Sequence, residues 1–215
     1  MNSSKPNRRS QVQRRAESEG KLLSATAALI VERGLNNVSL AEIGRRAGYS
    51  HALVNHLFGT KIALIERLNK VVDDFYYENT KHAMEQSGLD GLLSFIEVYL
   101  RLVTGSDPIG RVHVVLWAEA IAGAPEIRPS RAAWDRHFRE GVGALTARAA
   151  IETGRRVDVD TTAFVIVGLL RGVAMQLLVD PTSISVRAAT EEVSRLVREL
   201  LGSTTTALSG DTDRG

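Results

Sequence analysis

The fold of this chain is decided by Ser39–Lys61, which reads SLAEIGRRAGYSHALVNHLFGTK. Ser39 can cap a first helix, and Glu42 stands three residues later, which is the spacing of a capping box. Gly48 follows where the end of a helix favours a left-handed residue, and Ser50 can cap a second helix. The stretch therefore predicts two helices of about two turns each, joined by a glycine turn.

Each of these two helices has one apolar face. Its members recur at steps of three and four residues: Leu40, Ile43, Gly44 and Ala47 in the first helix, and Leu53, Val54, Leu57 and Phe58 in the second. Helices this short cannot bury enough surface to stand alone, so they must pack on a larger scaffold. The arrangement is the helix-turn-helix pattern, whose second helix enters the major groove of DNA.

The charge of the chain is unevenly distributed. Residues 1–61 hold ten Lys and Arg against four Asp and Glu, whereas residues 62–215 hold seventeen against twenty-one. One basic end on an otherwise acidic protein indicates a polyanionic partner at that end, although a solvated basic surface has the same composition.

Several classes of protein are disfavoured by what the sequence lacks. It has no cysteine, so disulfides and thiolate metal sites are excluded, and we expect neither a cofactor nor a metal. The N-terminus is basic and polar without an apolar segment, which does not fit a signal peptide. The most apolar run, residues 163–170, is too short to span a bilayer and is followed by Arg171. We therefore expect a cytoplasmic, nucleoid-associated protein without membrane contact.

The sequence matches neither of two enzyme motifs that an all-helical or serine-dependent enzyme could carry. Residues 48–52, GYSHA, are similar to a nucleophile elbow, but no strand precedes them and alanine replaces the last glycine. Carboxylate metal bundles use paired Glu-x-x-His motifs, and none occurs here. A protein that only binds other proteins would leave the capped helix pair on a basic end unexplained. The sequence therefore predicts a protein that is not an enzyme.

The remaining helices are predicted from apolar periodicity and from Gly and Pro at their ends. With the two short helices they give about nine, and no alternating strand pattern occurs, so the predicted fold class is all-α. The further helices are expected at residues 14–33, 61–85, 92–103, 109–121, 129–153, 161–179 and 185–201, with a break at residues 88–91.

This organisation divides the chain into four segments. Residues 1–13 form a basic arm that we expect to be disordered, and residues 14–60 form the helix-turn-helix domain. Residues 61–202 form a larger helical domain, and the Ser/Thr/Gly-rich residues 203–215 form a tail that we also expect to be disordered. The arm could contact phosphate or the minor groove, or it could be inert.

The helix at residues 161–179 is apolar nearly all round, which predicts burial on most of its sides. Gly168 and Gly172 lie one turn apart in it, so another helix could approach closely there. The final two helices carry more apolar surface than one subunit needs, which indicates a homodimer interface at Gly168, Gly172, Leu196 and Leu200. Burial within a single subunit is the alternative.

The helix-turn-helix stretch and its surroundings resemble the TetR family of transcriptional regulators. The pattern reads aliphatic–Glu–Ile–small–x–x–Ala–Gly–x–Ser, then a short helix ending in Phe58, then Lys61 and Leu64. Residues 54–61, 116–120 and 172–181 are similar to the choline-responsive betaine-pathway (BetI-like) repressors within that family. The resemblance covers roughly residues 14–202.

This resemblance implies an all-helical homodimer that binds palindromic double-stranded operator DNA. A small-molecule effector would bind within residues 61–202, tilt the long helix at residues 61–85 and release the DNA. An activator, or a DNA-binding regulator without a ligand, is the alternative.

The DNA contacts implied by the resemblance come from the second short helix and its approaches. The groove-facing candidates are Ser50, His51, Ala52, Asn55 and His56, and the phosphate-contacting candidates by family position are Ser39, Tyr49, Thr60 and Lys61. Arg45 and Arg46 could add backbone contacts. For these two arginines and for His51 and His56, solvent exposure without a role is the alternative. Asn55 stands where the family usually has a tyrosine, and asparagine can donate to phosphate or read adenine with two hydrogen bonds. Tyr49 and Gly44 also depart from the usual valine and alanine.

The effector site is expected between the long helix and the helices that follow it. Candidates by residue type and place are Phe75, Phe95, Tyr99, His113, Trp117, Trp134, His137, Phe138, Arg171, Met175 and Gln176, for each of which core packing is the alternative. Arg171 could pair with Glu119 or with an anionic ligand.

Overall fold

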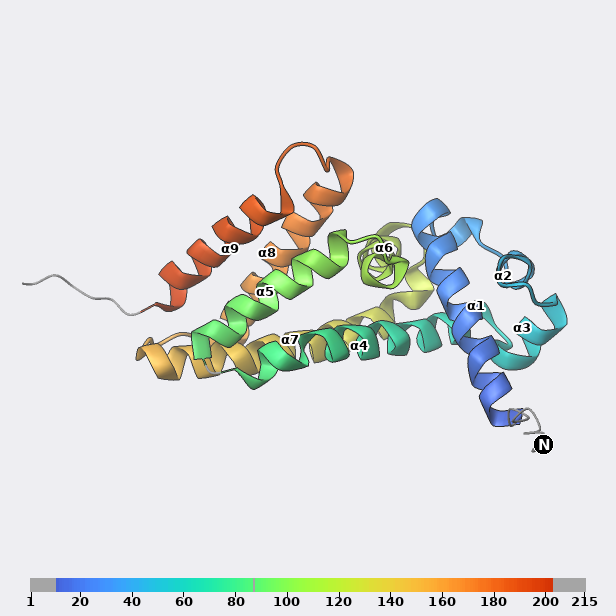
Figure 1. Ribbon diagram of the computed structural model, residues 1–215, viewed down its shortest axis with the longest axis horizontal. Helices are drawn as coiled ribbons and strands as arrows, with labels where there is room; N and C mark the ends of the chain where they lie inside the picture. Colours follow the sequence, from blue (N-terminus) through green and yellow to red (C-terminus); the bar gives the residue numbers. More distant parts are fainter. Residues whose placement is uncertain (1–10, 87, 203–215) are drawn as a thin grey trace, which may run out of the picture.

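The computed structural model describes residues 11–86 and 88–202, and every regular element in these ranges is helical. The first unit consists of α1 (Gln11–Arg33), the short turn η1 (Leu35–Asn37), α2 (Leu40–Ala47) and α3 (His51–Phe58). It lies at one end of an elongated molecule, with α3 at the extremity (Figure 1). The predicted all-α class is confirmed.

The end caps of the helix-turn-helix form as the sequence predicts. The side chain of Ser39 accepts from the backbone N–H of Glu42, and that of Ser50 accepts from Leu53. Gly48 ends α2 with φ 77° and ψ 29°, in the left-handed region where a side chain is disfavoured. These local contacts fix the angle between α2 and α3.

The crossing of α2 and α3 depends on Gly44. A Cβ at this position would lie 2.9 Å from the carbonyl oxygen of Tyr49 and 3.1 Å from Cγ2 of Val54. The two helices therefore approach too closely for an alanine at position 44, unless the turn moves.

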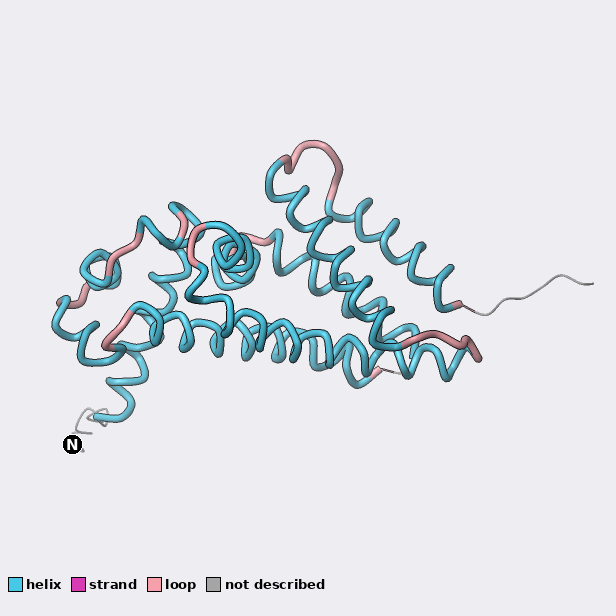
Figure 2. Tube along the Cα trace, turned by 180° about the vertical axis from the view of Figure 1, so that it is seen from behind, coloured by secondary structure: helices cyan, strands magenta, loops and turns pink. Residues whose placement is uncertain are grey.

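The larger unit begins with α4, which leads from the first unit along the length of the molecule beside α7 (Figures 1 and 2). Its elements are α4 (Lys61–Glu85), α5 (Gly88–Thr104), α6 (Pro108–Ala122), the turn η2 (Pro125–Ile127), α7 (Arg128–Thr153), α8 (Val159–Val179) and α9 (Val186–Leu201). The hydroxyl of Thr60 caps α4 by accepting from Ala63. One continuous core joins the two units, since α1 packs against α6 as well as against α2 and α4.

Two predicted boundaries are wrong. Residues 88–91 are not a break but the first turn of α5. Gly91 stands there because a Cβ would lie 2.9 Å from the carbonyl oxygen of Ala83. Helix α1 already includes residues 11–13, which belong to the predicted arm. The rest of the predicted arm, residues 1–10, and the predicted tail, residues 203–215, lie outside the described residues.

Helix α8 is less buried than its apolar sequence predicts. By length and composition it could cross a membrane, yet only 33% of its most apolar window is buried inside the chain. Phe164 and Val165 are 62% and 55% exposed, and nothing lies within 4 Å of a Cβ at Gly168 or Gly172. The expectation of burial on most sides is wrong for the single chain, and an apolar face of α8 is left open.

Candidate nucleic-acid interface and effector-binding centre

The outer face of α3 presents polar side chains at the end of the molecule. His51, Ala52, Asn55 and His56 are all exposed, while Val54 and Phe58 on the opposite face are buried in the core. Nδ2 of Asn55 lies 3.2 Å from Nε2 of His51, one turn earlier. The exposed face therefore offers hydrogen-bond donors and acceptors on a helix that is held from behind.

The capping hydroxyls lie at the start of three successive helices. Each oxygen of Ser39, Ser50 and Thr60 accepts a backbone N–H, which leaves its own O–H free to donate. A helix start is also the positive end of the helix dipole. These positions can each donate to a phosphate oxygen without losing their cap.

Arg45, Arg46 and Tyr49 differ in how accessible their side chains are to a phosphate. The side chain of Arg45 is 77% exposed and lies 3.7 Å from Glu42. Arg46 donates to both carboxylate oxygens of Glu32, at 2.6 and 3.1 Å, and Tyr49 is half-buried against the core. Arg45 is thus the available cation, whereas Arg46 would have to leave Glu32 to reach a phosphate.

Lys61 does not extend into solvent as a free phosphate contact. Its ammonium donates to the carbonyl oxygen of Leu35 at 2.5 Å. Partial burial lowers the pKa of this amino group, and the carboxylates of Glu126 and Glu119 oppose that effect. Lys61 therefore ties the start of α4 to the turn that precedes α2.

The same turn is held from the other side by α6. The backbone N–H of Leu35 donates to Oε1 of Glu119 at 2.9 Å, and Nδ2 of Asn36 donates to the carbonyl oxygen of Gly123 at 2.7 Å. Pairing of Glu119 with Arg171 was one of two expectations from the sequence, and it is wrong, because Glu119 lies at this junction. The turn η1 is thus clamped between the two units.

Replacing Glu119 by alanine is expected to destabilise this junction. The half-buried N–H of Leu35 would lose its acceptor, which typically costs about 1–3 kcal/mol of the free energy of unfolding. Glu119→Gln should cost less, because the amide oxygen can still accept. Chemical denaturation of both variants measures the difference, with Glu97→Ala on the exposed face of α5 as a control. Equal stability of Glu119→Ala and the unmodified protein would show that Glu119 does not stabilise the junction at η1.

Deep in the larger unit, aromatic rings from four helices pack against one another. The rings of Trp134 and Phe138 are stacked with centroids 5.1 Å apart, and Tyr99 lies 5.6 Å from both Phe138 and Tyr76. Phe75 and Phe95 continue the cluster on either side. The cluster brings together residues of α4, α5 and α7 around the ring of His113 from α6.

His113 is fully enclosed by this cluster. Its Nε2 lies 3.0 Å from the hydroxyl of Tyr99, and its Nδ1 lies 3.1 Å from the carbonyl oxygen of Gly110, which also accepts the hydroxyl of Tyr76. Nδ1 must therefore carry the proton, and Nε2 accepts from Tyr99. Burial, together with the charges of Arg131 and Arg171, holds the pKa of His113 well below its usual value, so the ring is neutral.

Acidification should therefore destabilise the protein through His113. The unfolded histidine binds a proton near pH 6.5 and the folded one does not. The unfolded state then binds more protons below that pH, so stability is full above about pH 6.5 and falls as the pH is lowered. The slope can reach about 1.4 kcal/mol per pH unit for one proton. Denaturation between about pH 7 and pH 5 should show a flatter profile for His113→Gln, and an unchanged one for exposed His82→Gln. An unflattened profile for His113→Gln would count against this assignment.

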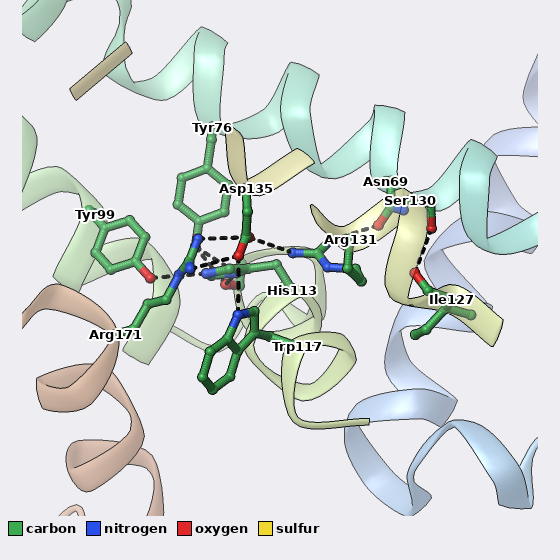
Figure 3. A network of polar contacts seen from close by, with 11 residues as sticks. Asn69, Tyr76, Tyr99, His113, Trp117, Ile127, Ser130, Arg131, Asp135 and Arg171 are labelled. Carbon is green, nitrogen blue, oxygen red and sulfur yellow. Dashed lines mark hydrogen bonds and ion pairs between the residues drawn. The ribbon is translucent and has the colours of Figure 1, made fainter. Parts of the chain in front are cut away.

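A carboxylate, Asp135, organises the charged groups beside the rings (Figure 3). Arg171 of α8 donates to both of its oxygens, at 2.9 and 3.0 Å, and Nε1 of Trp117 donates to Oδ2 at 3.2 Å. Nη2 of Arg131 lies 3.9 Å from Oδ1, too far for a hydrogen bond, while Nη1 donates to Oδ1 of Asn69 at 2.8 Å. We call Asn69, Trp117, Arg131, Asp135 and Arg171 the polar centre.

Most of the sequence-predicted effector candidates meet here. The structure brings together Phe75, Phe95, Tyr99, His113, Trp117, Trp134, Phe138 and Arg171. Met175 packs against the core further along α8, whereas Gln176 and His137 are exposed, the latter near Asp73 and Glu140. Those last two do not share the centre.

Four residues of the site were missed from the sequence, namely Asn69, Tyr76, Arg131 and Asp135. A signal for two of them was present on α7. Arg131 and Asp135 share the helical stripe of Trp134 and Phe138, at steps of three and four residues, so they had to lie on the buried face.

An open groove lies elsewhere, between α5 and α9, with a volume of about 960 Å³. Its walls include the exposed charged side chains of Asp90, Glu97, Arg101, Arg187 and Glu191. A small apolar or aromatic ligand would find few buried contacts there, so the aromatic cluster is the stronger candidate for an effector.

Comparison with known proteins agrees with the N-terminal unit. Residues 22–68 match the family model described as bacterial regulatory proteins, tetR family. The HTH-type transcriptional regulator CymR of Pseudomonas putida is 35% identical over 60 residues, which cover 28% of this chain and 30% of that protein. The chain thus aligns with less than a third of the length of this relative.

Solved structures agree with the fold of both units. A putative TetR-family transcriptional regulator from Rhodococcus sp. has a TM-score of 0.73 at 21% identity, over 87% of this chain and 100% of that chain. A putative transcriptional regulator from Saccharomonospora viridis, solved in complex with choline, has a TM-score of 0.67 at 20% identity, over 85% and 96%. Residues 22–68 thus match the tetR family of bacterial regulatory proteins, and the solved structures share the fold of the described chain.

Proposed function

We propose that the protein is a homodimeric transcriptional regulator that binds palindromic operator DNA and releases it when a small molecule binds the larger unit. The observation that carries this proposal is the exposed polar face of α3, on a capped helix-turn-helix at the basic end of the chain. Residues 22–68, which contain it, match the tetR family. Repression by occupancy of the operator is the simplest outcome of such binding.

In this proposal α3 lies in the major groove. Asn55 can read adenine with two hydrogen bonds, and His51 and His56 can contact base edges or phosphates on either side. The capping hydroxyls of Ser39, Ser50 and Thr60, together with Arg45, fix the helix against the phosphate backbone.

The dimer is proposed to form through α8 and α9. Phe164, Val165, Leu196 and Leu200 are each at least 40% exposed, and Gly168 and Gly172 leave room for a helix of a second copy. A two-fold axis there would place two copies of α3 for half-sites about 34–36 Å apart, one turn of DNA.

Release is proposed to act through the clamp on η1. A ligand that moves Trp117 in the polar centre also moves the C-terminal end of α6, where Glu119 and Gly123 hold Leu35 and Asn36. Because the half-site spacing is strict, a shift of a few ångströms between the two α3 helices weakens DNA binding. The ligand must bind the DNA-incompetent arrangement more tightly for this to work.

We do not extend the proposal to the choline-responsive subgroup. A quaternary ammonium needs open aromatic faces or a free carboxylate. Here the guanidinium of Arg131 lies 4.5 Å from the centroid of the Trp134 ring, and Asp135 is already paired with Arg171. Both features argue for a different effector.

The direct test is selection of bound sequences from a pool of random DNA duplexes, using the purified full chain. We expect one enriched palindrome, and affinity for it that falls steeply with salt concentration. The same titration on a scrambled duplex gives the specificity ratio. Recovery of no preferred sequence at moderate salt would refute the proposal.

A further inference from the structure

The polar centre has more hydrogen-bond donors than acceptors. Nε and Nη2 of Arg131 and Nε1 of Trp134 are buried without a hydrogen-bond partner among the described residues. The Arg131 side chain is only 3% exposed, so solvent does not compensate for the missing acceptors. A buried donor that lacks an acceptor is destabilising, and such a group calls for an explanation.

The unpaired atoms of Arg131 form one edge of its guanidinium. Nη1 is used by Asn69, whereas Nε and Nη2 lie side by side along the free edge. This edge matches the two oxygens of a carboxylate, which it can bind through two parallel N–H···O bonds. The geometry therefore fits a planar oxyanion better than a neutral or cationic group.

The charge of the polar centre also favours an anionic ligand. Two guanidinium groups, of Arg131 and Arg171, face the single carboxylate of Asp135, and Arg171 with Trp117 already occupies both of its oxygens. His113 is neutral, and although burial lowers the pKa of Arg131 to about 10, the group is still charged at neutral pH. One buried positive charge is left without a full partner, which is costly unless a ligand supplies it.

From these observations we infer that the effector is an organic carboxylate with an apolar body, whose two oxygens accept from the free edge of Arg131. This inference rests on the proposed function, because it assigns the ligand class of the same site. The apolar body would lie against the rings of Phe138 and Phe95. The ligand would enter past Trp117 and Phe138, which are half-buried.

The chain carries its own reporter for this test. Of its two tryptophans, Trp117 belongs to the polar centre and Trp134 packs against the guanidinium of Arg131, so intrinsic fluorescence responds to binding there. The probes are phenylacetate and octanoate, their neutral amides, and choline. We expect saturable fluorescence changes with the carboxylates at millimolar concentration or below, and at least tenfold weaker responses with the amides and with choline.

Two variants test the role of Arg131. Arg131→Met removes the guanidinium but keeps an unbranched side chain, and Arg131→Lys keeps the positive charge but loses the two parallel N–H donors. Carboxylate affinity should fall about tenfold or more in the first and by a smaller factor in the second. Arg136→Met, at an exposed position of α7, is the matched control and should bind as the unmodified protein does. If Arg131→Met does not fold, the comparison of acid and amide in the unmodified protein decides.

Two results would overturn the inference. One is equal or tighter binding of an amide or of choline, and the other is no saturable response to either carboxylate. Selection of operator DNA is carried out on the same preparations. If a palindrome is enriched but the carboxylate test fails, only the ligand class is refuted. If no sequence is enriched, the proposed function as a transcriptional regulator is refuted.

Discussion

Asn55→Asp is expected to abolish specific DNA binding while leaving the fold intact. Asparagine and aspartate have the same shape, and Asn55 is exposed on α3, so the core is unaffected. The change removes a two-bond contact to adenine worth about 1–3 kcal/mol per half-site and places a negative charge among the phosphates. Since the dimer has two half-sites, affinity should fall about 100-fold or more.

A gel-shift titration on the selected duplex measures this loss. Asn79→Asp is the matched control, because Asn79 is also an exposed asparagine but lies on α4, where its amide donates to the carbonyl of Phe75. Its affinity should stay within a few-fold of the unmodified protein. If Asn55→Asp bound the operator as tightly as Asn79→Asp does, α3 would not be the reading helix.

Phe164→Glu is expected to convert the proposed dimer to monomers. The side chain is 62% exposed in the single chain and lies on the open apolar face of α8. Burying a phenylalanine contributes about 1.5–3 kcal/mol, and two-fold symmetry doubles the effect of its loss. The buried glutamates add a further cost, so the dissociation constant of the dimer should rise about 100-fold or more.

Analytical ultracentrifugation over a range of concentrations measures that constant. Tyr77→Glu is a close match as a control, because Tyr77 is 64% exposed but lies on α4. We expect it to remain dimeric. A dimer that survives Phe164→Glu but dissociates with Tyr77→Glu would place the interface on α4 and refute the α8–α9 proposal.

The helix-turn-helix could be predicted from the sequence because its determinants are local. Ser39, Ser50 and Gly48 act within a few residues of themselves, and their caps form as predicted. The start of α5 could not be predicted in the same way. Gly91 looks like a helix breaker, yet it is required where α5 passes the carbonyl of Ala83, a contact that only the tertiary structure creates.

The pairings within the polar centre also could not be predicted from the sequence. Its aromatic residues and Arg171 could be proposed by type, and the stripe on α7 indicates that Asp135 is buried, but its pairing with Arg171 could not be predicted because the two residues are 36 positions apart. Lys61 was expected at a phosphate by family position, whereas the tertiary fold brings its ammonium to the carbonyl of Leu35. Long-range contacts of charged side chains decide both cases, and helical periodicity does not encode their partners.

The central claim is that two copies of α3 read DNA about a two-fold axis. Hydroxyl-radical footprinting of the full chain on the selected duplex tests it most directly. The account predicts protection on both strands, symmetric about the centre of the palindrome, with the two protected half-sites about one helical turn apart. Protection of a single half-site, or protection without two-fold symmetry, would contradict it.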